Sequence, residues 1–340
     1  MGIFNVAAMF LQPLAGGWVD RLGRRPFQVA GAACVALASL AFAFTERLSP
    51  LFLFLRVLQG IGHSTFFVAN YTFVADLVPL SRRGQALGIF GLSGLVSTAL
   101  APALGELLIR TFGFRLFFLS ATVMALSACL VSLRLKEPAR VSLAAIPPEP
   151  PAYPPGLAPR PLVLPLLLAG GFGVSFGTLF TFLPTYGRAL GVPSLSFFFL
   201  AYTFAALLSR LLGGGLIDRF GSRAIIGPAL ACQALGTMLL VALAFLPGAL
   251  GWVGFVLVGG FTGVAHGFIY PALAVRVMAA GPEARRGRVV GWFGSVFLFG
   301  NAAGAMTFGY VVQSTGYPIM FSLLVILLWG CVVLALRLDR

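Results

Sequence analysis

Charged side chains are scarce in this sequence. Only 9% of the 340 residues are Asp, Glu, Lys or Arg, whereas soluble domains carry roughly 25%. Apolar residues make up 59% of the chain, and its mean hydropathy is +0.99. A chain with so little polar surface cannot cover a water-soluble globule, and in lipid its backbone must hydrogen-bond within itself. The composition therefore predicts an integral membrane protein built only of α-helices.

Histidine, cysteine and acidic residues are also few, which excludes several kinds of site. The chain has 2 His, 4 Cys and 9 acidic residues. An enzyme needs a nucleophile with a base, or a cluster of metal ligands, and the sequence contains no H-E-x-x-H or G-x-S-x-G motif. We therefore expect no enzymatic activity, no cofactor and no metal. The cysteines lie singly within apolar runs, which predicts neither disulfides nor a zinc site: Cys34, Cys129, Cys232 and Cys331.

The net charge of +14 does not indicate nucleic acid as a partner. The 23 basic residues gather in short clusters between apolar runs, a pattern that sets the orientation of membrane proteins. We expect these clusters and the C-terminus to face the cytoplasm from the inner membrane, with Met1 on the opposite side. The clusters contain Arg21, Arg24, Arg25, Arg82, Arg83, Arg134, Lys136, Arg140, Arg219, Arg223, Arg285, Arg286 and Arg288.

Eleven apolar runs approach the ~20 residues that cross a bilayer as a helix. They are rich in Gly, Ala, Ser and Thr, which let helices pack closely within lipid. The sequence thus predicts a packed bundle of about eleven transmembrane helices. The runs cover 1–19, 27–45, 50–75, 86–109, 114–133, 163–186, 195–216, 224–246, 250–279, 288–312 and 317–336.

A proline-rich segment separates the fifth run from the sixth. Prolines dominate residues 147–156, which is typical of a stiff, extended spacer. We therefore expect an N-terminal half over 1–136, a cytoplasmic linker over 137–162 and a C-terminal half over 163–340.

The two halves repeat each other. The segment Gly16–Arg25 aligns with Gly214–Arg223, and farther along Arg82–Gly84 aligns with Arg285–Gly287. Because the motifs keep their order and their orientation, the halves are parallel repeats related by an axis along the membrane normal.

These motifs resemble those of the major facilitator superfamily over nearly the whole chain. Gly16–Arg25 resembles the G-x-L-a-D-R-x-G-R-R loop between the family's second and third helices, and Gly214–Arg223 stands where the family has its second copy. Arg56–Gly62 is similar to the R-x-x-q-G-x-g signature of helix four, and Ala101–Gly105 is a partial version of the Gly-Pro signature of helix five.

The resemblance implies a monomeric secondary carrier, an efflux or metabolite permease that moves a small solute by alternating access. A coupling proton stays open, since no acidic residue lies mid-span near Arg56. The alternative is a truncated protein of this type that does not transport, as a receptor or an inactive fragment. The family has twelve helices and its loop motif follows the second, whereas one span precedes Gly16 here, so the first family helix is missing from this sequence.

The loop motif also has a physical reading of its own. Asp20 can accept hydrogen bonds from neighbouring backbone N–H groups and from an Arg, and glycines permit close helix contact and a tight turn. We expect a polar latch that holds one conformation; the alternative is that the arginines only set the topology. The candidate latch residues are Gly16, Asp20, Arg21, Gly23, Arg24, Arg25, Arg210, Gly214, Asp218, Arg219, Gly221 and Arg223.

The third span carries a polar stripe that predicts a lining of the substrate cavity. Its residues share one helical face, and ionisable groups within a membrane usually face a wet interior. His63 is either a group that titrates during transport or a structural histidine, and its repeat mate His266 is expected to face it. Elsewhere isolated polar groups either line the cavity or bond across helices. The candidates are Arg56, Gln59, His63, Asn70, Thr178, Tyr186, His266, Tyr270 and Asn301.

The missing helix yields a prediction about the gene. If the start codon was placed downstream of the true one, the DNA upstream of Met1 encodes an in-frame apolar segment of roughly 20 residues. Sequencing that DNA tests this. A stop codon directly upstream, with no such segment, would instead indicate a shortened chain.

Overall fold

The computed structural model describes residues 2–45, 50–137, 160–192, 195–245, 251–281 and 285–339. These residues form α-helices and two short 3-10 turns, with no strand among them, so the prediction of an all-α fold is confirmed. The predicted proline-rich spacer at 147–156 lies outside the described residues. The helices are α1 (Gly2–Leu22), α2 (Arg25–Phe42), α3 (Pro50–Leu77), α4 (Arg83–Arg134), α5 (Arg160–Ala189), α6 (Ser196–Leu243), α7 (Gly251–Ala280), α8 (Arg286–Thr315) and α9 (Tyr317–Ala335).

Two of these helices are each interrupted by one glycine. Gly113 in α4 and Gly221 in α6 have φ values of 79° and 81°, outside the helical region. Glycine adopts positive φ without the steric cost that a Cβ brings. Each interruption falls between two predicted spans, so the helical segments correspond one to one with the eleven apolar runs of the sequence.

Nine of the described helical segments are long and apolar enough to cross a membrane. Large apolar side chains are exposed along them, including Met124 (74% exposed), Phe204 (69%) and Phe54 (62%). Exposed apolar surface on this scale suits lipid rather than water as the surrounding solvent. The chain is therefore a multi-pass integral membrane protein.

The described residues group into two compact units that are not the two halves of the sequence. Unit 1 comprises Met1–Leu77, Leu100–Pro159 and Met278–Ser295, and unit 2 comprises Val78–Ala99, Arg160–Val277 and Val296–Arg340. Each unit thus includes a short segment from the opposite half. The predicted boundary within the 137–162 linker remains a prediction.

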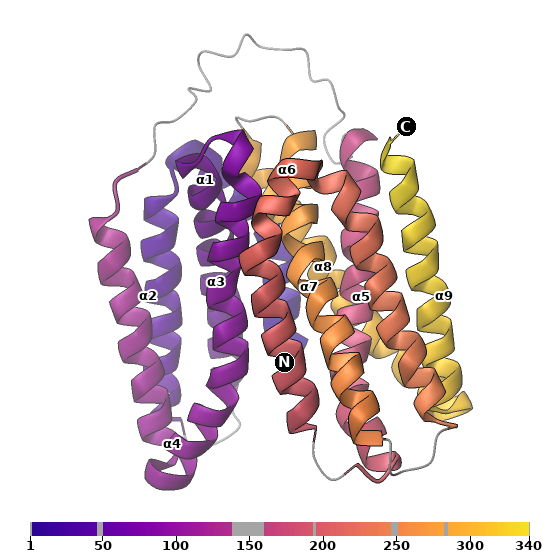
Figure 1. Ribbon diagram of the computed structural model, residues 1–340. Coiled ribbons are helices and arrows are strands. Elements are labelled where there is room, and N and C mark those ends of the chain that lie inside the picture. Colours follow the sequence, from indigo (N-terminus) through magenta and orange to yellow (C-terminus); the bar gives the residue numbers. More distant parts are fainter. Residues whose placement is uncertain are drawn as a thin grey trace. The chain divides into compact units, whose positions relative to one another are not determined.

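Helices in unit 1 pack through small residues. α3 lies beside both α1 and α2 (Figure 1). A Cβ on Gly62 of α3 would lie 2.7 Å from the Gly31 carbonyl oxygen of α2, so the two backbones touch. Ser64 is fully buried and donates to the Gly60 carbonyl at 2.8 Å. As expected from the composition, small side chains allow this close approach.

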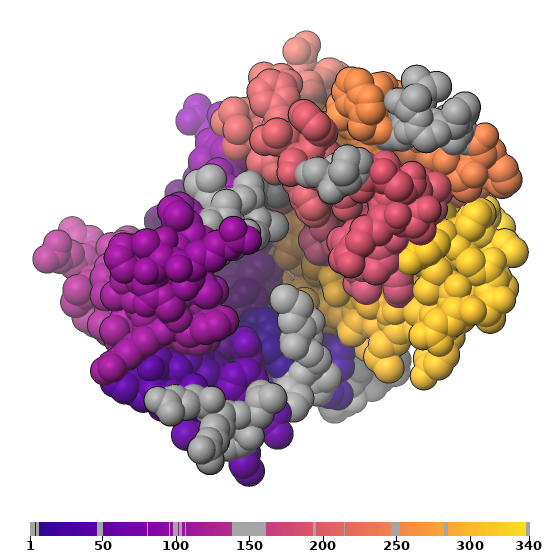
Figure 2. Space-filling model, turned by 90° about the horizontal axis from the view of Figure 1, so that it is seen from below, coloured from indigo at the N-terminus to yellow at the C-terminus, as the bar shows by residue number. Residues whose placement is uncertain are grey.

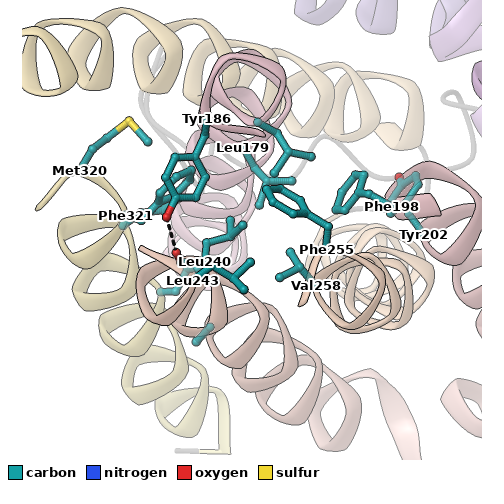
Figure 3. Packing of buried hydrophobic residues seen from close by; sticks show 14 of the residues in the cluster. Leu179, Tyr186, Phe198, Tyr202, Leu240, Leu243, Phe255, Val258, Met320 and Phe321 are labelled. Carbon is teal, nitrogen blue, oxygen red and sulfur yellow. Dashed lines mark hydrogen bonds between the residues drawn. The ribbon is translucent and has the colours of Figure 1, made fainter. Parts of the chain in front are cut away.

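Unit 2 has a core of interlocking aromatic and aliphatic side chains (Figure 3). Tyr186 of α5 is 2% exposed, lies 5.1 Å from the Phe321 ring of α9, and donates its hydroxyl to the Leu240 carbonyl at 2.8 Å. One flank of this unit is formed by α9 beside α5, in yellow and crimson in Figure 2. The hydroxyl bond lets a tyrosine be buried without an unsatisfied donor.

Replacing Gly62 with Ala is expected to destabilise the packing of α2 on α3. The added methyl would meet the Gly31 backbone, and overpacking of this kind costs about 1–3 kcal/mol. The matched control is Gly260→Ala on α7, where a Cβ meets nothing within 4 Å. Thermal unfolding in detergent should show a lower Tm for Gly62→Ala alone; equal Tm values for the two variants would contradict the contact.

Candidate functional site

Asp20, near the end of α1, caps the first turn of α8. Its carboxylate oxygens accept hydrogen bonds from the backbone N–H groups of Gly287 and Arg288, at 2.7 and 2.9 Å. The first N–H groups of a helix lack partners within the helix and lie at its positive end, so an anion there is stabilised. The expectation of neighbouring donors is corrected, since these donors lie 267 and 268 positions away in the sequence.

Asp218 makes the equivalent contact in unit 2. Its oxygens accept the backbone N–H groups of Gly84 and Gln85 at the start of α4, at 2.8 and 2.9 Å. The aspartates are repeat mates, and so are the two Arg-Arg-Gly motifs that supply the donors. The two repeats found in the sequence therefore meet, each loop motif with the Arg-Arg-Gly motif of the other half.

Glycines are required at both contacts. A Cβ on Gly287 would lie 2.6 Å from the Gly16 carbonyl oxygen and 2.8 Å from an Asp20 carboxylate oxygen. A Cβ on Gly84 would lie 2.7 Å from an Asp218 oxygen. Any side chain at Gly287 or Gly84 would displace the carboxylate from the helix terminus.

The turn after each aspartate is also made by glycine. Gly23 has φ 103° and donates its N–H to the Val19 carbonyl at 3.0 Å, which ends α1. Gly221, its repeat mate, has φ 81°. Left-handed glycines commonly end helices in this way, so both glycines of the motif serve the tight turn that the sequence predicted.

Burial raises the pKa of Asp20 to about 6, against the N–H groups of Arg288 and Gly287 and the charge of Arg24, which lower it. Asp20 lies beyond the predicted span 1–19. The value is below 7, so the carboxylate is mainly ionised at neutral pH. As the pH falls through about 6, the buried Asp20 carboxylate takes up a proton, whereas a carboxylate in water does so only near its ordinary pKa of 3.8. Protonation between these two values therefore stabilises the buried state of Asp20 relative to the solvent-exposed state.

Asp76, at the end of α3, joins two arginines in unit 1. It pairs with Arg24 at 2.8 Å and with Arg286 at 2.6 Å, and all three side chains are about nine-tenths buried. Removing one member of a buried pair leaves an uncompensated charge. The repeat mates of Asp76 and Arg24 are Ala279 and Ser222, which carry no charge. The equivalent ion pair therefore cannot form beside the Asp218 cap.

Sequence reasoning did not place Asp76 among the candidates. The feature that could have identified Asp76 is an acidic residue at a helix end, in a chain with only 9 acidic residues. Its partners lie 52 and 210 positions away, which no local pattern indicates.

The other candidate latch residues have varied surroundings. The backbone N–H groups of Arg24 and Arg25 donate to Glu137 at 2.6 and 2.9 Å, which caps α2. Arg219 lies over the Phe220 ring, 5.3 Å from its centroid. Arg210 was expected beside Asp218; it is buried with its guanidinium against Gly91 of α4. The exposed members of the set are Arg21, Arg25, Arg219 and Arg223.

The polar stripe of α3 contains one bonded pair, Arg56 and Gln59. Arg56 donates to Gln59 at 3.1 Å, and its guanidinium lies 5.2 and 5.3 Å from the ring centroids of Phe42 and Phe52. This aromatic contact offsets part of the cost of a cation within an apolar helix.

Farther along α3, Asn70 accepts a hydrogen bond from Gln28 of α2 at 3.2 Å and donates to the Phe66 carbonyl at 2.7 Å. His63 is exposed and lies 5.4 Å from the Phe4 ring. Since His63 belongs to unit 1 and His266 to unit 2, the prediction that they face each other stays a prediction.

His266 lies in an aromatic cluster within unit 2. Its Nδ1 atom is 3.2 Å from the Tyr202 hydroxyl. The rings of Phe172, Phe176 and Phe180 have centroids 4.9, 5.1 and 5.9 Å from the His266 ring. The cluster places one buried polar ring among aromatic faces.

Several buried polar atoms near this cluster have no hydrogen-bond partner among the described residues. They are the Nε2 atom of His266 and the hydroxyls of Thr178 and Thr262. A buried unsatisfied polar group costs about 1–3 kcal/mol. A bound solute or water with polar atoms would remove that cost.

The remaining cavity candidates lie in unit 2. Tyr186 belongs to the core and its hydroxyl is bonded, an arrangement typical of a packing residue. Tyr270 packs on Phe297, with ring centroids 5.4 Å apart. Asn301 is half-buried on α8 where Gly177 of α5 meets its backbone. In the part of the chain that the structure describes, no three His, Cys, Asp or Glu residues gather as metal ligands.

Reciprocal substitutions test the two helix caps. Asp20→Ala removes the acceptor of the Gly287 and Arg288 amides, so these amides should exchange hydrogen faster by about tenfold or more, because a hydrogen bond to a charged group contributes about 1.5–3 kcal/mol. Asp218→Ala should do the same to Gly84 and Gln85. Hydrogen exchange with mass spectrometry measures both, and each variant is the control for the other.

If Asp20→Ala accelerated exchange at Gly84 as much as at Gly287, the substitution would have loosened the whole bundle, and the specific cap would be contradicted.

Comparison with known proteins agrees with this architecture. The family model described as Major Facilitator Superfamily matches residues 1–264 and 194–340. The human organic anion transporter MFSD10 (TETRAN) has a crystal structure similar to this fold, with a TM-score of 0.81 at 21% identity over 98% of this chain and 82% of that one. FucP, in an outward conformation, gives a TM-score of 0.76 at 16% identity over 100% of this chain and 90% of that one.

Curated relatives carry names that refer to drug resistance. Multidrug resistance protein MdtG of Enterobacter lignolyticus (strain SCF1) is 26% identical over 99% of this chain and 82% of its own length. Multidrug resistance protein 2 of Bacillus subtilis (strain 168) is 33% identical over 38% of this chain, and the match spans 32% of that protein's length. Since the family model covers the sequence from end to end and the repeated motifs meet as described, the chain belongs to the major facilitator superfamily.

Proposed function

We propose that this protein is a secondary carrier that moves small amphipathic solutes across the cytoplasmic membrane by alternating access. The observation that carries the proposal is the duplicated helix cap. In it Asp20 and Asp218 hold the starts of α8 and α4 through four backbone hydrogen bonds. Such contacts break and re-form without covalent change, as a two-state latch requires.

The class of substrate is inferred from the aromatic cluster of unit 2. Phe172, Phe176 and Phe180 surround His266, and polar atoms of His266 and Thr178 there are unpaired among the described residues. Aromatic walls with a few polar groups suit a neutral or weakly polar aromatic solute. The names of the curated relatives, which refer to multidrug and chloramphenicol resistance, support efflux as the direction.

The orientation follows from the basic residues. The loop motifs and the Arg-Arg-Gly motifs that meet them carry most of the clustered arginines, and basic loops face the cytoplasm. We therefore propose that both helix caps lie on the cytoplasmic side. A monomeric state is part of the proposal, whereas a coupling proton stays open.

A protein of this family that does not transport is the second candidate. A match over 99% of this chain to a relative named for multidrug resistance favours transport. Vesicles that contain the full chain and are loaded with a panel of aromatic dyes and drugs, with and without a proton gradient, distinguish the two. No flux of any compound would overturn the proposal.

Arg56 gives the sharpest test of the substrate path. Arg56→Ala is expected to lower flux by about tenfold or more while membrane insertion stays normal, because the variant loses a charged hydrogen bond to Gln59. Arg188→Ala, an exposed position at the end of α5, is the matched control and should transport normally. Flux of Arg56→Ala equal to that of the control would remove Arg56 from the site.

A further inference from the structure

A cavity of about 490 Å³ opens in unit 1 where α1 ends and α8 begins. Its walls carry Trp18, Asp20 and Arg21 from α1, Arg285 directly before α8, and Arg288 and Trp292 from the start of α8. The volume falls within the roughly 300–1,000 Å³ typical of small-molecule sites. The cavity lies beside the Asp20 cap, not among the residues proposed for the substrate path.

The cavity carries a net positive charge. The described residues that line it include three arginines and one aspartate, and both oxygens of Asp20 already accept the N–H groups of Gly287 and Arg288. Arg288 thus bonds Asp20 through its backbone, and its side chain is exposed. Guanidinium groups bind phosphate oxygens in bidentate fashion, so the chemistry favours a phosphate or phosphodiester.

An apolar stripe leads to the same cavity. Phe10, Leu14 and Trp18 follow one another at four-residue intervals on one face of α1 and are 68%, 57% and 44% exposed. Leu14 and Trp18 also line the cavity. Trp292 is 37% exposed on the opposite wall. Indole rings are enriched at the headgroup level of a bilayer, so an acyl chain can follow the stripe while its headgroup reaches the arginines.

The repeat supplies an internal comparison. The positions that correspond to Trp18, Trp292 and Arg288 are Leu216, Ile89 and Gln85. The cap at Asp218 therefore has the same backbone contact without the indoles and with one arginine fewer. Because the Asp218 cap forms without these residues, Trp18, Trp292 and Arg288 are not needed for helix capping.

We propose that this cavity binds the headgroup of an anionic phospholipid, with the phosphate held by Arg21, Arg285 and Arg288 and an acyl chain along Phe10, Leu14 and Trp18. Basic pockets between transmembrane helices recognise the headgroups of such lipids. The occupant would then lie next to the Asp20 cap, and the lipid composition of the membrane would act on that contact.

Native mass spectrometry of the purified full chain in detergent tests the proposal, with phosphatidylglycerol and phosphatidylcholine of identical acyl chains as probes. The protein should retain phosphatidylglycerol in preference to phosphatidylcholine by about tenfold or more. The variant Arg285→Gln with Arg288→Gln should lose that preference. The matched control is Arg82→Gln with Arg219→Gln, which removes two arginines near the Asp218 cap and should keep it.

A charge-conserving variant guards against misfolding. Arg285→Lys with Arg288→Lys should retain most of the preference and elute as a single species on size exclusion. Equal retention of the two lipids, or an unchanged preference in the Gln variant, would overturn the proposal. Displacement of phosphatidylglycerol by millimolar inorganic phosphate would also overturn it, since the ligand would then be the free anion.

Discussion

The structure depends on a carboxylate placed at the start of a helix. Asp20 and Asp218 each accept two backbone N–H groups that would otherwise lack partners. In a chain with nine acidic residues, two are used for this purpose. The contact is polar and directional, whereas the surrounding helix surfaces are apolar and non-directional. It can therefore fix the register of α1 on α8 and of α6 on α4, which lipid-facing surfaces cannot do.

The two caps share a backbone pattern but differ in the side chains around them. The Asp20 cap has Asp76 with its two arginines beside it, and a cationic cavity bordered by two indoles. At the positions of Asp76, Arg24, Trp18 and Trp292 the Asp218 cap has small or aliphatic residues. Both repeats thus have the contact between backbone N–H groups and a carboxylate. The ion pairs of Asp76 and the two indoles are found only at the Asp20 cap. More charged side chains therefore lie near the Asp20 cap than near the Asp218 cap.

The aromatic side chains inside unit 2 surround polar groups of two kinds, one bonded and one without a partner among the described residues. Around Tyr186 the polar hydroxyl is satisfied by the Leu240 carbonyl and the core is closed. Around His266 the rings are similar in number, yet polar atoms of His266, Thr178 and Thr262 have no partner among the described residues. Buried polar groups are normally bonded, and this difference is why the proposed substrate contacts are assigned to the His266 cluster rather than to the Tyr186 core. The two groups of rings therefore differ in their hydrogen bonding.

The sequence by itself determined the membrane setting, the eleven helical segments, the positions of their interruptions and the repeat, because apolar run length and glycine placement act locally. It also identified Gly23 and Gly221, whose positive φ follows from the turn that ends each helix. Only the tertiary structure decided what Asp20 and Asp218 bind, that Asp76 joins Arg24 to Arg286, and that Tyr186 is a core residue. These contacts join groups that lie dozens to hundreds of positions apart. The sequence around a carboxylate therefore does not indicate which distant helix terminus the carboxylate will bind.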